Sequence, residues 1–201
     1  MVLPDLDLVF LAYNKAGSSS IEAALHGHRS AVWEAYARAG HQALRRPGPW
    51  KHMNAREFER LFAWRRAVTG MHRVAVVRNP WDRMVSVYHY QRQTVPQSHD
   101  RARELDFRDY VLRGGQGSAF TTFTDFAGDG SGELKVDTVL RVETLDDDFA
   151  ALCAARGLTG ISLPRKNTSA RGDYRELYDD DTREAVGRAF AADIERFGYR
   201  F

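Results

Sequence analysis

The chain has 201 residues, 43% of them hydrophobic and 28% charged, a balance typical of a globular protein. This length suits a sizeable core, so we expect a single domain over residues 1–201, with two small domains as the alternative that stays open. The formal net charge of +2 is too small to indicate a nucleic-acid partner, and no apolar run approaches the ~20 residues that cross a bilayer, so we expect no membrane partner either.

The first predicted elements are a buried strand over residues 8–13 and a helix over about 18–25, joined by a polar loop. In this loop Lys15 supplies a positive charge and Gly17 permits a tight turn. The amides that open a helix have no internal partner, which favours an anion there. A phosphate-bearing ligand is therefore the first hypothesis, although an ordinary strand–helix turn with a capping serine stays open.

A helix is predicted over 31–39, a loop over 40–50 and another helix over 55–64. A second buried strand over 73–77 then leads directly into Arg78. Asn79 resembles a helix cap and Pro80 suits the first helical position. Arg78 thus follows the carboxyl end of a strand, where open α/β sheets bind ligands.

The rest of the chain predicts mixed structure. We expect a surface loop over 94–101, a short helix over 107–112, a candidate flap over 115–134, a strand over 138–142, a helix over 145–155, a loop over 161–174 and two closing helices that end near Arg196. Cys153 is the only cysteine, so an internal disulfide is excluded and a packed core thiol is the favoured interpretation. The acidic runs 146–148 and 179–181 are explained by helix capping, and we expect no metal.

The two polar segments, taken together, resemble the PAPS-dependent sulfotransferases. The closer resemblance is to the heparan sulfate 2-O type of carbohydrate sulfotransferase and its bacterial relatives. In that family a strand–loop–helix with Lys, Gly and Ser/Thr holds the 5′-phosphosulfate, here Lys15-Ala16-Gly17-Ser18-Ser19-Ser20. A second element, Arg-x-Pro-x-x-Arg-x-x-Ser-x-Tyr, holds the 3′-phosphate, here residues 78–88. The segments 141–145, 167–169 and 193–199 also look like this branch.

The resemblance implies an α/β fold with a parallel β-sheet flanked by helices, similar to the P-loop nucleotide kinases. It implies transfer of the sulfuryl group from PAPS to a hydroxyl of a carbohydrate or small metabolite, with adenosine 3′,5′-bisphosphate (PAP) as the product. We expect a cytoplasmic bacterial enzyme, because the chain shows no basic leader pattern before its first strand. The oligomeric state stays open.

The resemblance also assigns roles to residues. Lys15 would stabilise the leaving 5′-phosphate, and Arg78 with Ser86 would bind the 3′-phosphate. His52 is the candidate general base, because it stands 26 residues before Arg78, an interval similar to that of the family's catalytic histidine. His26 and His89 are the rival bases. The basic loop 165–171 could close over the nucleotide, with Ser169 and Arg171 contacting phosphate.

Several alternatives stay open at this stage. Arg83 could reach the ligand or form a structural ion pair with Asp82 or a C-terminal acid, and Glu143 is structural by default. A small-molecule kinase is the second enzymatic hypothesis, although Lys15 precedes Gly17 and so departs from the Mg-ATP pattern Gly-x-x-x-x-Gly-Lys-Ser/Thr. A catalytically silent nucleotide-binding module is the third.

Overall fold

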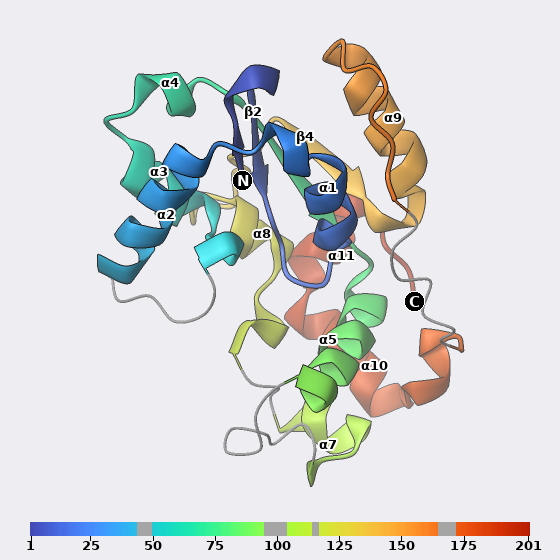
Figure 1. Cartoon of the computed structure of the whole chain (residues 1–201). Coiled ribbons are helices and arrows are strands. Elements are labelled where there is room, and N and C mark those ends of the chain that lie inside the picture. The colour runs from blue at the N-terminus through green and yellow to red at the C-terminus, as the bar shows by residue number, and fades with distance from the viewer. Residues whose placement is uncertain (44–49, 95–103, 114–116, 165–171) are drawn as a thin grey trace. The chain divides into compact units, whose positions relative to one another are not determined.

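The computed structural model describes residues 1–43, 50–94, 104–113, 117–164 and 172–201 (Figure 1). The chain divides into two compact units. The first comprises Met1–Val77 with Thr124–Asn167, and the second comprises Arg78–Phe123 with Thr168–Phe201. Within the described parts of the chain, no helix is long and apolar enough to cross a lipid bilayer.

The first unit is built on a four-stranded sheet in the order β1-β2-β3-β4. Strands β2 (Leu8–Leu11), β3 (His72–Val77) and β4 (Thr138–Arg141) run parallel, as the sequence predicted. The short β1 (Val2–Leu3) pairs antiparallel with β2, so the sheet is mixed rather than wholly parallel. All of β2 and the last four residues of β3 are buried, which matches their unbroken apolar runs.

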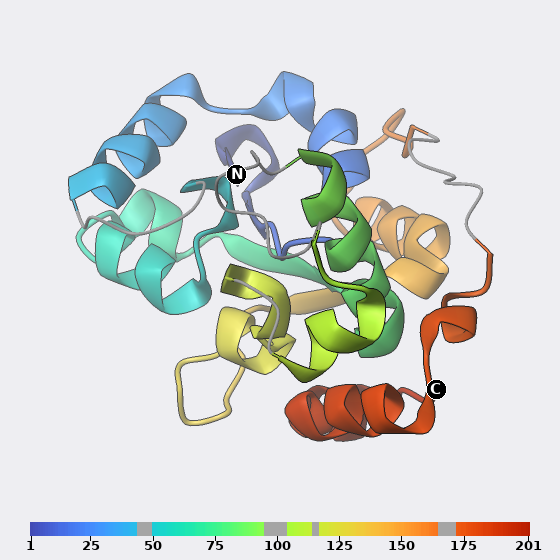
Figure 2. The same cartoon turned by 90° about the horizontal axis from the view of Figure 1, so that it is seen from below.

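Helices cover both faces of this sheet (Figure 2). On one side lie α2 (Ala31–Ala43), α3 (Ala55–Phe62) and α4 (Arg66–Thr69). On the other side lie α1 (Ser18–Ala24) and α9 (Leu145–Ala155). Short 3-10 turns connect them: η1 (Pro4–Leu6), η2 (His26–His28), η3 (Trp50–His52) and η6 (Val142–Thr144).

Helix α2 ends later than the sequence predicted. The predicted loop was to begin at Gly40, but the helix continues through this glycine to Ala43. A Cβ atom at Gly40 would lie 2.1 Å from a methyl group of Leu61, so α2 and α3 approach each other closely at this point. The glycine therefore permits helix packing and does not end the helix. Residues 44–49 of the predicted loop lie outside the described residues.

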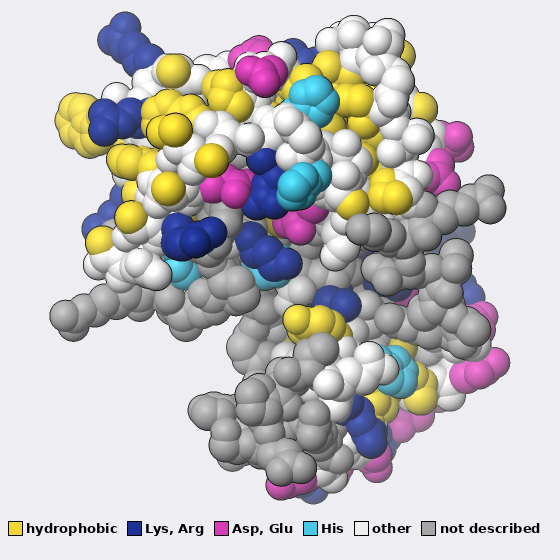
Figure 3. Space-filling view, in the orientation of Figure 1, with side chains coloured by type: hydrophobic (Ala, Val, Ile, Leu, Met, Phe, Trp, Pro, Cys, Tyr) yellow, Lys and Arg dark blue, Asp and Glu magenta, His cyan; other side chains and the backbone are white. Residues whose placement is uncertain are grey.

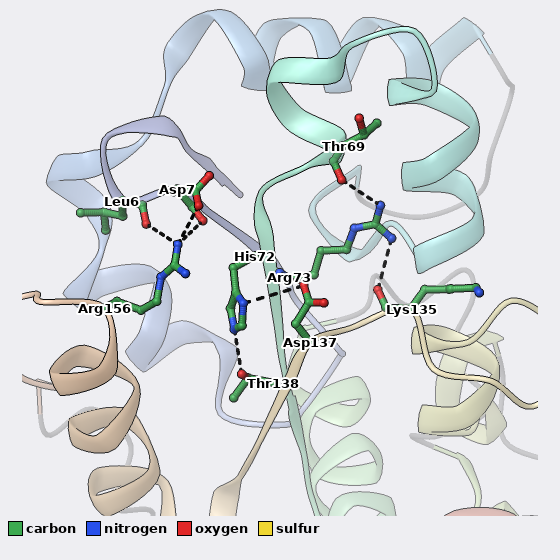
Figure 4. Close-up of polar contacts among 9 residues, drawn as sticks. All are labelled: Leu6, Asp7, Thr69, His72, Arg73, Lys135, Asp137, Thr138 and Arg156. Carbon is green, nitrogen blue, oxygen red and sulfur yellow. Dashed lines mark hydrogen bonds and ion pairs between the residues drawn. The ribbon is translucent and has the colours of Figure 1, made fainter.

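The edge of the sheet where β2 and β3 begin is fastened by polar contacts (Figure 4). The Arg156 guanidinium lies 2.9 Å from both the carboxylate and the carbonyl oxygen of Asp7, which has a left-handed backbone with φ of 49°. Nε2 of His72 lies 2.8 Å from the Thr138 hydroxyl, and this contact joins β3 to β4. These contacts hold together the edge of the sheet at which β2 and β3 begin.

The second unit is helical. It contains α5 (Pro80–Thr94), α7 (Phe107–Leu112), η5 (Gly117–Phe120), η7 (Tyr174–Leu177), α10 (Asp180–Ala189) and α11 (Ala191–Phe197). Trp81 ties α5 to the C-terminal segment, since its indole N–H donates to the Arg183 carbonyl and its own carbonyl accepts from the Tyr178 hydroxyl. The α5, α7 and α10 helices pack on one another.

The candidate flap over 115–134 has regular structure in its described part. After η5, helix α8 (Phe123–Ala127) leads to a turn closed by a bridge between Gly128 and Leu134. In this turn the Asp129 carboxylate accepts from the amide and hydroxyl of Ser131 and pairs with Lys135, and these contacts lower the pKa of Asp129 to about 2.

Candidate functional site

The polar loop after β2 has the backbone geometry expected of an anion site. Lys15 has a φ of 63° and Gly17 a φ of 69°, so the chain takes two left-handed steps before α1 begins at Ser18. Left-handed backbone at a non-glycine residue is uncommon and often marks a functional position. A Cβ atom at Gly17 would also lie 3.1 Å from a methyl group of Leu145, so a larger residue would be crowded as well as strained there.

The serines of this loop have different functions. The Ser18 hydroxyl is buried and donates to the Tyr13 carbonyl over 2.8 Å, so it closes the loop rather than facing a ligand. Ser20 uses its amide to donate to the Gly17 carbonyl. For the amides of Gly17, Ser18 and Ser19, no acceptor is present among the described residues. These three N–H groups, at a helix start and beside Lys15, fit a phosphate or sulfate group.

His52 lies beside this loop. Its Nδ1 is 2.7 Å from the carbonyl oxygen of Ala12, which follows directly on β2. A carbonyl can only accept, so Nδ1 carries a proton, and in the neutral imidazole the free lone pair lies on Nε2. Burial lowers the pKa of His52, and the charges of Lys51 and Lys15 lower it further, while the bond to Ala12 and the charge of Glu22 oppose this shift. The imidazole is therefore kept neutral with Nε2 as the proton acceptor.

Helix capping fixes the position of His52. Asn54 caps α3: its side chain accepts from the Glu57 amide, and the Glu57 carboxylate accepts from the Asn54 amide. Because η3 ends at His52, only Met53 separates the imidazole residue from this cap, and Met53 is itself buried. The reciprocal cap thus anchors the segment that carries His52.

An apolar pocket adjoins this segment in the first unit. Lys51 and Met53 line it together with aromatic side chains of α2 and α3, namely Trp33, Phe58 and Phe62. Its free space is about 20 Å³, which holds one water molecule and no larger ligand. We therefore do not assign the acceptor to this pocket.

The second predicted motif belongs to the helical unit. The Arg78 guanidinium makes a two-point contact with the Asp82 carboxylate, with Nε at 2.8 Å and Nη2 at 2.7 Å. Ser86 is only 2% exposed on α5. Val77, the last residue of β3, precedes Arg78 directly, so this motif and the Lys15 loop leave the carboxyl ends of two neighbouring parallel strands.

Arg83 is a residue of the core. It is 1% exposed, donates to the Ala119 carbonyl over 2.9 Å and lies over the Phe190 ring. Asp82, one of its expected partners, binds Arg78 instead. A buried guanidinium held in this way stabilises the helical unit, so we assign Arg83 a structural role.

The remaining candidates are placed as follows. His26 is exposed in η2, and His89 is half-buried on α5 with its ring 5.4 Å from that of Tyr88. Ser169 and Arg171 lie outside the described residues. Sequence reasoning missed two contacts of the candidate residues. One is the pairing of Arg78 with Asp82, which their spacing of four residues could have indicated. The other is the bond between His52 and the Ala12 carbonyl, for which no side-chain signal exists.

Comparisons with known proteins address the fold and the family of this chain. The crystal structure of mouse sulfotransferase SULT7A1 complexed with PAP is similar to this chain, with a TM-score of 0.53 and 15% sequence identity over 96% of this chain and 88% of that chain. No curated protein matches the sequence. The model of the sulfotransferase family matches residues 1–200, nearly the whole sequence. The chain therefore belongs to the sulfotransferase family.

Proposed function

We propose that this protein transfers the sulfuryl group of PAPS to an acceptor hydroxyl, with His52 as the general base. The observation that carries the proposal is the contact between His52 Nδ1 and the Ala12 carbonyl. It orients the imidazole beside the Lys15 loop, and in the neutral form, which the lowered pKa of His52 favours, Nε2 is available for a proton. A histidine that is only a surface residue, or that only caps a helix, does not require a hydrogen bond to the Ala12 carbonyl beside the Lys15 loop.

The Lys15 loop would hold the 5′-phosphosulfate end of the donor. The amides of Gly17, Ser18 and Ser19 would donate to its oxygens, and the Lys15 ammonium would neutralise charge on the phosphate oxygen that leaves. The Ser18 hydroxyl is already used by Tyr13, so it would contribute its amide alone. A loop held in this left-handed backbone conformation would require little reorganisation to bind an anion.

The 3′-phosphate would be bound by Arg78 and Ser86. Nε and Nη2 of Arg78 both donate to the Asp82 carboxylate, and these two bonds fix the plane of the guanidinium group. Such a fixed plane favours the two-point contacts that a phosphate offers. Ser169 and Arg171 remain candidates for further phosphate contacts.

In the reaction, PAPS supplies the sulfuryl group. His52 Nε2 would take the proton of the acceptor hydroxyl as the acceptor oxygen attacks sulfur. The bond between sulfur and the phosphate oxygen breaks on the opposite side, and Lys15 would stabilise the negative charge that develops there. The chain would release PAP and a sulfate ester, with the proton on His52 returned to solvent.

The resemblance of the two motifs supports a carbohydrate or small-metabolite hydroxyl as the acceptor, and a bacterial origin. The single cysteine agrees with a reducing compartment such as the cytoplasm. The family match does not favour a kinase or a silent nucleotide-binding module.

The test combines calorimetry with a turnover assay on radiolabelled PAPS and a panel of hydroxyl acceptors. PAP should bind the wild type and His52→Gln alike, while His52→Gln should lose turnover by about 10²-fold or more. His26→Gln is the matched control, because His26 is an exposed histidine of the same unit, and it should keep full turnover. Retained turnover in His52→Gln contradicts the assignment of the base, and preference for Mg-ATP over PAP contradicts the proposed reaction.

A further inference from the structure

The turn between α3 and α4 displays a tryptophan to solvent. Helix α3 ends at Phe62 and α4 begins at Arg66, and Trp64 between them is 87% exposed. Large aromatic side chains are normally buried in a core or an interface. The exposed Trp64 side chain is therefore a candidate for contact with another molecule.

Three arginines surround this tryptophan in the sequence and are exposed: Arg60, Arg65 and Arg66. We name residues 60–66 the Trp64 tip. The acidic residues of α3 are engaged elsewhere, since Glu57 caps the helix and Glu59 pairs with Arg73 over 2.7 Å. Among the described residues, none of the three tip arginines forms an ion pair, so the tip carries uncompensated positive charge.

The tip rests on a packed support. The Tyr36 hydroxyl of α2 donates to the Leu61 carbonyl over 3.1 Å, and the Tyr36 ring lies 5.3 Å from that of Phe62. The Arg65 guanidinium lies over the same tyrosine ring. One turn earlier on α2, Val32 is 74% exposed. Figure 3 shows hydrophobic and basic side chains side by side over the region of α2 to α4.

We propose that the Trp64 tip binds the surface of an anionic lipid bilayer. Tryptophan and arginine are the residues that favour the bilayer interface, where an indole lies among the headgroups and a guanidinium contacts lipid phosphate. A nucleic-acid partner would require a wider basic surface than a chain of net charge +2 provides. The sequence predicted no membrane partner because it has no spanning segment, and peripheral binding needs none.

The tip lies apart from the candidate active residue within the same unit. His52 precedes the start of α3, and the tip includes the end of this eight-residue helix, about 12 Å further along. Binding to a bilayer through Trp64 would therefore leave His52 uncovered. The inference does not depend on the proposed reaction, and either can fail alone.

The test is sedimentation of the protein with vesicles of phosphatidylcholine, with and without 25% phosphatidylserine, at low and high salt. Each arginine near an anionic surface contributes about fivefold in affinity, so three should give on the order of 100-fold preference for the anionic vesicles. High salt should abolish this preference. Arg65→Gln/Arg66→Gln should weaken binding by about 25-fold, and Trp64→Ser should weaken it on both vesicle types.

The control variant is Arg113→Gln/Arg188→Gln, which removes two exposed arginines that pair with Asp109 and Glu184. It should bind vesicles as the wild type does, and all variants should share the wild-type thermal midpoint. Absence of vesicle binding, or equal losses in the control and the tip variant, overturns the proposal. Preferential binding of single-stranded DNA, or a dimer that Trp64→Ser dissociates, overturns it in favour of those partners.

Discussion

Replacing Gly17 with alanine should destabilise the protein and weaken PAP binding together. The left-handed backbone at φ 69° costs a non-glycine residue about 1–2 kcal/mol. The new Cβ would lie 3.1 Å from Leu145, and crowding of this kind adds about 1 kcal/mol. The total of about 2–3 kcal/mol corresponds to a loss of roughly 8 °C in Tm for a chain of this size.

Gly157→Ala isolates the first of these two contributions. Gly157 has a φ of 65°, close to that of Gly17, and a Cβ atom there would meet nothing within 4 Å. Its replacement should therefore cost only the backbone strain of about 1–2 kcal/mol, or roughly 4 °C in Tm. Since Gly157 follows α9 rather than the Lys15 loop, PAP affinity should stay at the wild-type value.

The assay is a thermal melt of wild type and both variants, followed by calorimetric titration of PAP into each. Gly17→Ala should bind PAP at least about tenfold more weakly, because strain at position 17 would displace the amides of Gly17, Ser18 and Ser19 that we assign to the phosphate. Equal losses of Tm in the two variants would refute the argument from crowding. Unchanged PAP affinity in Gly17→Ala would refute the assignment of the loop.

Three further results are expected. Burial lowers the pKa of His52 below its ordinary 6.5 in the free enzyme, so the acidic limb of log kcat/KM for PAPS against pH should bend below pH 6.5, and a bend above that value contradicts a neutral buried base. Asn54→Ala should lower the free energy of unfolding in a denaturant titration by about 1 kcal/mol and should also lower kcat. Asp106→Ala, which removes the cap of α7, should lower the free energy of unfolding by a similar amount but leave kcat unchanged. Burial raises the pKa of the Cys153 thiol, which should react with a disulfide reagent only after unfolding; rapid reaction in the native state would show that it is accessible.

Sequence reasoning found most of the sheet because buried parallel strands have an unmistakable pattern. The runs 8–11 and 74–77 are continuously apolar, and each is followed by polar residues at the carboxyl edge. β1 was missed because two residues carry no periodicity. The glycine at position 40 was misread as a helix end, since its close contact with Leu61 depends on tertiary packing that no local pattern reveals.

The candidate site was predictable by residue type but not by contact. The sequence identifies Lys15, Arg78 and His52 as positions after strands or near helix starts. It does not reveal that the Ser18 hydroxyl donates to the Tyr13 carbonyl of its own loop, or that the buried Arg83 guanidinium lies over the Phe190 ring. Those outcomes depend on rotamers and neighbours from distant parts of the chain, and composition and spacing do not determine them.

The contact between His52 and Ala12 has a consequence for mutational scans. The orienting group is a peptide carbonyl, so no side-chain substitution at position 12 deletes it. A saturation library would report Ala12 as a small buried packing position, tolerant of glycine and intolerant of bulk. Such a library would not detect the partner that orients the His52 imidazole. Only replacing the backbone amide that carries this carbonyl, for example with an ester linkage, would weaken it as an acceptor.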